Sequence, residues 1–465
     1  MAYSAGSAKI DITPPLTIPY VGGLPRHSLF EGVHDELYAR AVAITDVTPN
    51  KTIIMITVDA LGLNNDILGP TRDFTAEVRA KVTTATGVPA ANIMLASSHA
   101  HSTPETGDVR HLYTDPAKLT WLEGLRDKLA QVAANAYASR QTVTAKHVRG
   151  EIEPGSFVKN RDSAFYPAGT APIDTEIGVL TLENAAGTWR TVVVNFACHP
   201  VIMQVNPYVS ADYPGAAAAW VERNVPGLDV CLFLQGAAGN INPDDDPLWD
   251  DQRSAFDERN MPNLAVIRDS FAHNERIGLA LGMTVADLSN GLPGKAVTGP
   301  IRAYAEKINV ASRPLPARGP YQAEFDLRTQ AVQDAINNGA SEEEIVALRN
   351  AAQEYEEYLA AIDRGTATID AEVQGLRFGN VAFMGMPGEP FVEFGLQLKA
   401  LSNTNRTITP VGYANDYLGY FMPQALWDAG VWESTLGCQT RMGRDAGVAI
   451  YNKAAALVTK LWQNV

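Results

Sequence analysis

Short runs of apolar and β-branched residues recur through the first half of the chain. They occupy residues 41–45, 52–58, 92–95, 191–197 and 230–235. Several runs are continuously apolar, which is the pattern of strands buried on both faces. Helical patterns lie between them, for example at residues 74–86 and 119–139. The alternation predicts an α/β fold in which a mixed β-sheet core is covered by helices.

The segment 321–363 has a different pattern, because its apolar residues recur at spacings of three and four. Ser341 and Glu344 form a capping box, and Asn337–Gly339 supplies a turn before it. We therefore predict a helical hairpin laid on the main domain as a packing element. Residues 372–401 then return to two strands and a helix. Since no repeat or long linker divides the chain, we expect residues 1–465 to form one domain.

Composition excludes several classes of protein. The formal net charge of −15 argues against a nucleic-acid partner, because phosphate binding needs clustered lysine and arginine. The longest apolar runs are too short for a transmembrane segment. Three cysteines, Cys198, Cys231 and Cys438, do not make a disulfide framework. The first residues lack the basic and apolar regions of a secretion signal, so we expect a cytoplasmic protein.

Four segments place polar residues just after an apolar strand, where open α/β sheets carry their sites. They read SSHAHST (97–103), NFACHPVIM (195–203), FLQGAAGNINPDDD (233–246) and MGMPGEPFVEF (384–394). In the first, His99 and His101 are two residues apart, so at a strand end both rings would face the same side. In the third, Gly236 and Gly239 would let backbone N–H groups approach a ligand closely.

Two further residues complete a candidate metal site. His199 stands between a strand and a proline, and Glu389 follows a Pro-Gly turn at the entrance to a helix. Alone, His199 is equally explained as a buried histidine bonded to backbone, and Glu389 as an acid near a helix N-terminus. Two or three imidazoles with one carboxylate are, however, the usual ligands of a catalytic zinc ion.

The ordered set of motifs resembles the catalytic domain of the neutral/alkaline non-lysosomal ceramidases. The motifs are AKIDITPP (8–15), the H-x-H segment, NRDSAFY (160–166), ACHP (197–200), SADYPG (210–215), QGAAGNINP (235–243), PGE (387–389) and NDYLGY (415–420). Members of this family are zinc-dependent amidases that cleave the fatty-acyl amide of ceramide. The resemblance therefore implies the catalytic fold of that family and a lipid-like substrate.

The resemblance also implies roles for individual residues. His101 would face the substrate carbonyl and Arg161 would lie at the same site. A tyrosine of the NDYLGY motif, Tyr420, would also bind the zinc ion, and Tyr417, about one turn away, is the alternative at this position. A tyrosinate ligand is chemically reasonable, since a nearby dication lowers the pKa of the phenol. The implied zinc ligands are His99, His199, Glu389 and Tyr420.

The chain departs from the family in two respects. Family ceramidases carry a serine in a Gly-Asp-x-Ser-Pro loop, described as the nucleophile or as a partner of the zinc-bound water. Here Asn242 takes that place in the run Gly239–Pro243, and a carboxamide cannot act as a nucleophile. We also expect the protein to lack the family's carboxy-terminal immunoglobulin-like domain.

These observations lead to two hypotheses. In the first, zinc activates water directly, Asn242 positions substrate or water, and His101 with Arg161 stabilises the developing oxyanion. The bond would be an amide, with an ester, a lactone or a glycosidic bond as alternatives. In the second, the metal site is kept but a lipid or sugar is bound without turnover. The acidic run Asp244–Asp246 is either a second cation site or a solvated loop.

Overall fold

The computed structural model describes most of the chain. Its described ranges are residues 2–20, 29–107, 111–152, 157–204, 206–243, 264–290, 294–365, 368–437 and 439–463. Within them the largest sheet is nine-stranded, and its β13 (Lys295–Ala296) pairs with part of β6. The other strands, in spatial order, are β11 (Leu228–Gln235), β9 (Arg190–Phe196), β8 (Glu176–Glu183), β6 (Gln141–Glu151), β1 (Tyr3–Asp11), β3 (Tyr38–Asp46), β4 (Lys51–Val58) and β5 (Ile93–Ser97).

This sheet is mixed, as predicted. β5 pairs parallel with β4, and β11 pairs parallel with β9, whereas the strands between these pairs run antiparallel. All five apolar runs identified in the sequence fall in β3, β4, β5, β9 and β11. Helix α1 (Phe74–Thr86) begins at Asp73, whose side chain accepts a hydrogen bond from the Ala76 N–H, and ends at Gly87 with φ 75°.

A second sheet packs against the first, which the sequence pattern did not indicate. Its strands are β14 (Ile301–Ala311), β15 (Thr368–Phe378), β16 (Val381–Gly385) and β18 (Thr407–Val411). Alternate residues of each strand point to opposite faces. Thus Met55 of β4 and Val193 of β9 join Leu376 and Phe383 in a core between the two sheets.

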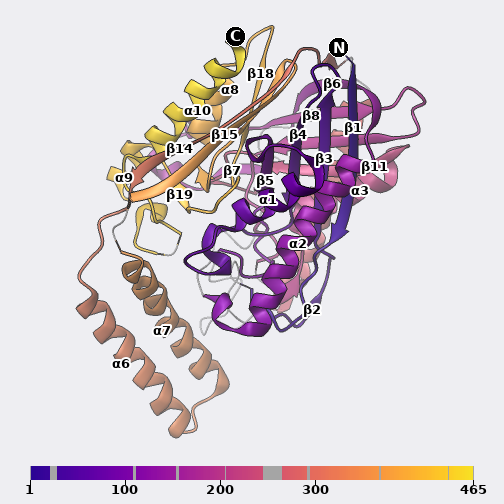
Figure 1. Cartoon of the computed structure of the whole chain (residues 1–465). Helices are drawn as coiled ribbons and strands as arrows, with labels where there is room; N and C mark the ends of the chain where they lie inside the picture. Colours follow the sequence, from indigo (N-terminus) through magenta and orange to yellow (C-terminus); the bar gives the residue numbers. More distant parts are fainter. Residues whose placement is uncertain are drawn as a thin grey trace.

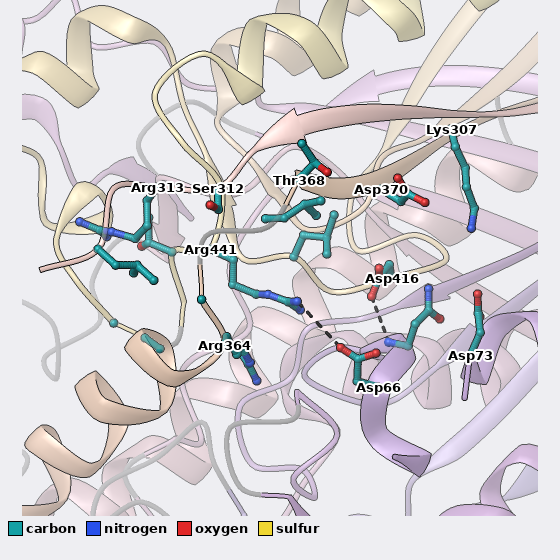
Figure 2. Close-up of a pocket in the computed structure, with 18 of the residues that line it drawn as sticks. Asp66, Asp73, Lys307, Ser312, Arg313, Arg364, Thr368, Asp370, Asp416 and Arg441 are labelled. Atoms are coloured by element: carbon teal, nitrogen blue, oxygen red, sulfur yellow. Dashed lines mark hydrogen bonds and ion pairs between the residues drawn. The ribbon is translucent and has the colours of Figure 1, made fainter. Parts of the chain in front are cut away.

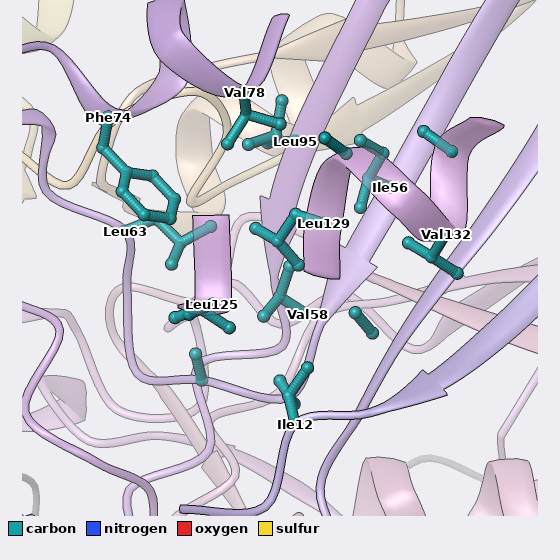
Figure 3. Close-up of a cluster of buried hydrophobic side chains, with 14 of the residues drawn as sticks. Ile12, Ile56, Val58, Leu63, Phe74, Val78, Leu95, Leu125, Leu129 and Val132 are labelled. Atoms are coloured by element: carbon teal, nitrogen blue, oxygen red, sulfur yellow. The ribbon is translucent and has the colours of Figure 1, made fainter. Parts of the chain in front are cut away.

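Helices cover the outer faces of both sheets, so the molecule has four layers (Figure 1). On the large sheet lie α1, α2 (Pro116–Ala138), α3 (Asp212–Asn224) and α5 (Leu264–Asn290). On the second sheet lie α8 (Val392–Lys399) and α10 (Ala446–Trp462). Figure 3 shows the core under α2, where Leu125, Leu129 and Val132 pack against Ile56 and Val58 of β4.

Shorter elements fill the connections. Three pairs of short strands are β2 (Gly32–Val33) with β10 (Tyr208–Val209), β7 (Val158–Asn160) with β12 (Ile241–Pro243), and β17 (Glu389–Pro390) with β19 (Tyr420–Phe421). Helix α9 (Gln424–Ala429) and the 3₁₀ turn η5 (Trp432–Ser434) follow β19. Within the described ranges, every helix is too short or too polar to cross a lipid bilayer.

The segment predicted as a hairpin consists of α6 (Arg318–Asn337) and α7 (Glu342–Asp363), inserted between β14 and β15. The Ser341 side chain accepts a hydrogen bond from the Glu344 N–H, as a helix N-cap does. The expectation that the hairpin lies on the main domain is wrong, because Figure 1 shows it extending away from the body. Its aromatic residues face each other instead, with the Tyr321 ring centroid 5.7 Å from that of Tyr358.

The core under α2 yields a test of packing. Leu129 is fully buried, so Leu129→Ala should lower the free energy of unfolding by about 2–5 kcal/mol. Leu279→Ala is the matched control, because Leu279 is 43% exposed on α5 and should change stability by roughly 0.5 kcal/mol or less. Urea denaturation of both variants measures the difference. Equal losses in the two variants would contradict this account of the core.

Candidate metal centre

Two imidazoles and a carboxylate meet where strands of the two sheets end. His99 lies two residues beyond β5, His199 three residues beyond β9, and Glu389 begins β17. The Nε2 atoms of His99 and His199 are 3.0 Å apart. Glu389 Oε2 lies 3.1 Å from each of these nitrogens. All three residues are at most 1% exposed, so the centre is shielded from bulk water.

The other ring nitrogen of each histidine is tied to the backbone. Nδ1 of His99 lies 2.6 Å from the Leu61 carbonyl oxygen, and Nδ1 of His199 lies 2.6 Å from that of Ala238. A carbonyl only accepts, so the proton of each neutral ring is on Nδ1 and Nε2 presents a bare lone pair. Backbone contacts of this kind orient metal-binding histidines in proteins.

The donor set fits a divalent cation. Burial lowers the pKa of His199 to about 4, so its ring is neutral at physiological pH. Two bare imidazole nitrogens and a carboxylate oxygen within 3.1 Å of one another then repel in the absence of a positive charge between them. A cation at this point removes the repulsion and satisfies all three donors.

His101 belongs to the same cluster, although not for the reason that the sequence suggested. β5 ends at Ser97 and His99 has a left-handed φ of 69°, so the segment turns and the strand alternation does not apply. The turn brings His101 Nε2 to 3.2 Å from His99 Nε2, with the two rings perpendicular. The ligand atoms of His99, His101 and His199 lie within 4.8 Å of one another, so this group could hold a metal ion.

Three tyrosines from the segment 413–420 surround the centre. The hydroxyl oxygen of Tyr420 lies 3.4 Å from His199 Nε2. The Tyr417 hydroxyl donates to Glu389 Oε1 at 2.6 Å, on the far side of the carboxylate. Tyr413 stacks on His99 with centroids 4.1 Å apart, and its hydroxyl donates to Glu389 Oε2 at 3.4 Å. Sequence reasoning missed Tyr413, for which the only available signal was its position beside the NDYLGY motif.

Arg161 lies at the edge of the centre and is held by protein groups. It follows β7, and its guanidinium carbon is 5.2 Å from the Tyr420 ring centroid. Its Nε donates to Glu433 Oε1 at 2.5 Å and its Nη2 to the Gly239 carbonyl at 2.6 Å. Its Nη1 donates to Asn242 Oδ1 at 3.4 Å. No sequence motif singled out Glu433, because it is 272 residues away from Arg161.

The glycines of the QGAAGNINP segment serve packing within the protein. A Cβ atom on Gly236 would approach the Ala197 Cβ to 2.8 Å, and one on Gly239 would meet the Glu389 carbonyl oxygen at 2.8 Å. The expectation that they allow close approach to a ligand is therefore wrong, because other segments of the chain fill that space. The acidic run Asp244–Asp246 lies outside the described residues.

A polar pocket of about 280 Å³ is lined in part by Asp416 and Leu418 of the segment 413–420. Asp416 lines it and accepts a hydrogen bond from the Asn65 N–H, while Arg441 forms a long ion pair of 3.9 Å with Asp66 (Figure 2). Arg364, at the base of the hairpin, also lines it. Burial raises the pKa of Asp416 to about 6. The histidines are not among the lining residues, so the pocket is distinct from the metal centre.

Comparisons by sequence match about half of the chain. Residues 3–255 match the family model described as neutral/alkaline non-lysosomal ceramidase, N-terminal. The neutral ceramidase of Drosophila pseudoobscura pseudoobscura is 25% identical over 268 residues, and that of Drosophila melanogaster 24% over 273 residues. Each alignment covers 52% of this chain and 36% of the relative, so it spans little more than a third of the relative's length.

Solved structures match the whole chain. The crystal structure of neutral ceramidase from Pseudomonas aeruginosa has a TM-score of 0.72 and 18% identity, and covers 100% of this chain and 76% of that chain. A structure described as ceramidase complexed with C2 has a TM-score of 0.70, with the same identity and coverage. The predicted α/β class is confirmed. On the match over residues 3–255, the chain belongs to the neutral/alkaline non-lysosomal ceramidase family.

Proposed function

We propose that the protein is a zinc-dependent hydrolase that cleaves an amide bond in a lipid-like substrate. The observation that carries the proposal is the meeting of two bare imidazole nitrogens and the Glu389 carboxylate at one buried point. Tyr420 would supply a fourth ligand from its position beside His199. Membership of the ceramidase family supports the amide as the bond and an N-acylated lipid as the substrate class.

The donor atoms support zinc as the metal. Imidazole nitrogen and carboxylate oxygen are the common ligands of catalytic zinc sites. When bound, zinc polarises a carbonyl group and makes a water molecule acidic near neutral pH. The chain's own residues fix the geometry, because the Leu61 and Ala238 carbonyls hold the rings of His99 and His199.

Exposure indicates the side from which a substrate would arrive. His99 and His199 are completely buried, whereas His101 is partly accessible to solvent. A substrate carbonyl that reaches the centre would therefore pass His101, whose ring can donate a hydrogen bond to a developing oxyanion. In this proposal His101 faces the substrate, although its ring also lies close enough to the other two histidines to bind the metal.

The purified protein should contain about one zinc ion per chain. His199→Ala removes one nitrogen donor and should abolish stoichiometric zinc retention under dialysis against a chelator, measured by elemental analysis. His147→Ala is the control, because His147 is also buried but lies on β6 in the interior of the large sheet, paired with Lys295 of β13. If His199→Ala retains one zinc ion per chain, the ligand assignment is wrong.

His101→Ala and His99→Ala should differ in zinc content. With His101→Ala the zinc should stay bound while kcat falls by about 10²-fold, because a contact to the oxyanion is lost. With His99→Ala both the zinc and the activity should be lost. Elemental analysis and initial rates on the same samples separate the two results. Equal loss of metal in both variants would mean that His101 is itself a ligand.

The substrate class is tested with the zinc-loaded wild-type protein. It should release fatty acid from a short-chain ceramide, detected by chromatography, and a chelator should stop the release until zinc is restored. Esters and glycosides with the same acyl or alkyl chain serve as comparisons. Cleavage of an ester or glycoside without any cleavage of the amide would overturn the proposed bond type.

A further inference from the structure

Asn242, where the chain departs from the family's serine, has its side chain fixed in one orientation. It lies in β12 and is completely buried. Its Oδ1 accepts a hydrogen bond from Arg161 Nη1 at 3.4 Å. The reverse orientation would set amide N–H groups against guanidinium N–H groups, and both are donors. The arginine therefore determines that Nδ2 points away from it.

The Nδ2 atom of Asn242 has no acceptor among the residues that the structure describes. Buried polar groups in native proteins nearly always have a partner, so this exception calls for an explanation, and a bound ligand is one that fits its position. The neighbourhood is that of the metal centre. The Ile241 carbonyl, one residue before Asn242, accepts the backbone N–H of His199 at 2.8 Å, and the Ala238 carbonyl binds the His199 ring.

The hydrogen bonds already made by Asn242 restrict the chemistry of that ligand. Nδ2–H is a donor, so the ligand must present an acceptor atom, and Arg161 already holds the acceptor side of the Asn242 amide. A carbonyl oxygen only accepts, and it is the acceptor that an amide substrate presents. The N–H of Asn242 therefore suits the carbonyl oxygen of such a substrate.

The orientation of Asn242 depends on Glu433, because Glu433 holds Arg161. Glu433 is completely buried in η5 and pairs with the guanidinium through Oε1. A partly buried arginine is held in place by such a partner. Without Glu433, only the hydrogen bonds to the Gly239 carbonyl and the Asn242 amide would hold the guanidinium.

We infer that Asn242 is a substrate-binding residue whose amide N–H donates to the carbonyl oxygen of the substrate, and that Glu433 positions it through Arg161. The inference rests on the proposed function for the identity of the substrate. In this role Asn242 binds the substrate and does not act as a nucleophile. Glu433 acts only through the guanidinium and does not touch the substrate.

Binding of octanamide, a short acyl amide, tests the inference through an affinity instead of a rate. Isothermal titration with the zinc-loaded protein should show binding to the wild type and a Kd about 3–10-fold weaker for Asn242→Asp, which keeps the acceptor for Arg161 and loses the donor. Thermal unfolding and zinc content should match the wild type. An unchanged Kd, or no binding of octanamide to the wild type, would overturn the inference.

A double-mutant cycle tests the positioning role of Glu433. Glu433→Gln should weaken octanamide binding in the wild-type background and have no further effect in the Asn242→Ala background. Glu393→Gln is the matched control, because Glu393 is a nearby, partly buried carboxylate that accepts from Asn240 instead of Arg161. Its effect should be the same in both backgrounds. Additive effects of Glu433→Gln and Asn242→Ala would show that Glu433 does not act through Asn242.

Turnover separates this inference from the proposed function. If the zinc-loaded wild type binds octanamide with the expected dependence on Asn242 but releases no fatty acid from any amide, the proposed function fails and the inference stands. If amides are hydrolysed, Asn242→Asp should lower kcat by about 10²–10³-fold with a smaller change in KM. Hydrolysis that is insensitive to Asn242→Asp would overturn the inference and leave the proposed function intact.

Discussion

The Glu389 carboxylate, buried between two imidazole nitrogens, is the constraint on which the site depends. An isolated carboxylate in such a place costs several kcal/mol unless opposite charge or hydrogen bonds offset it. Tyr417 satisfies Oε1, which leaves Oε2 facing His99 and His199. Because the backbone carbonyls of Leu61 and Ala238 take the ring protons, neither imidazole can donate to Oε2 without becoming charged. The fold thus holds three electron-pair donors in an arrangement that could hold a metal ion.

This arrangement requires both sheets. His99 and His199 follow strands of the large sheet, whereas Glu389 follows β16 of the second sheet and Tyr420 follows β18. Hydrogen bonds join the two sets, since Ser97 N–H donates to the Tyr413 carbonyl and Gly239 N–H to the Pro390 carbonyl. The apolar core between the sheets therefore sets the distance between His99 and Glu389, which lie 290 residues apart in sequence (99 to 389). Packing that is remote from the site thereby controls its geometry.

Local patterns predicted the local structure well. The apolar runs gave five strands of the large sheet, and residues 74–86 coincide with α1, because burial and capping act within one element. The second sheet and the partnership of Arg161 with Glu433 were not predicted, because both depend on contacts between distant segments. For His99 the sequence indicated a candidate metal ligand but not the backbone conformation, because its left-handed φ arises from the turn after β5. The candidate site residues that the sequence indicated lie together in one region of the fold. They are His99, His101, His199, Glu389, Tyr420, Arg161 and Asn242.

The hairpin of α6 and α7 leaves the second sheet and returns to it at a single point, because Ala311 and Thr368 are paired neighbours in the β14–β15 ladder. The pairing of β14 with β15 fixes the register of the ladder. A change in the length of the inserted segment therefore leaves that register unchanged. Each doubling of a flexible insertion adds only about 0.6 kcal/mol of closure entropy. This junction is consequently a place where evolution can lengthen, shorten or exchange a whole module of surface while the framework of the two sheets keeps its geometry.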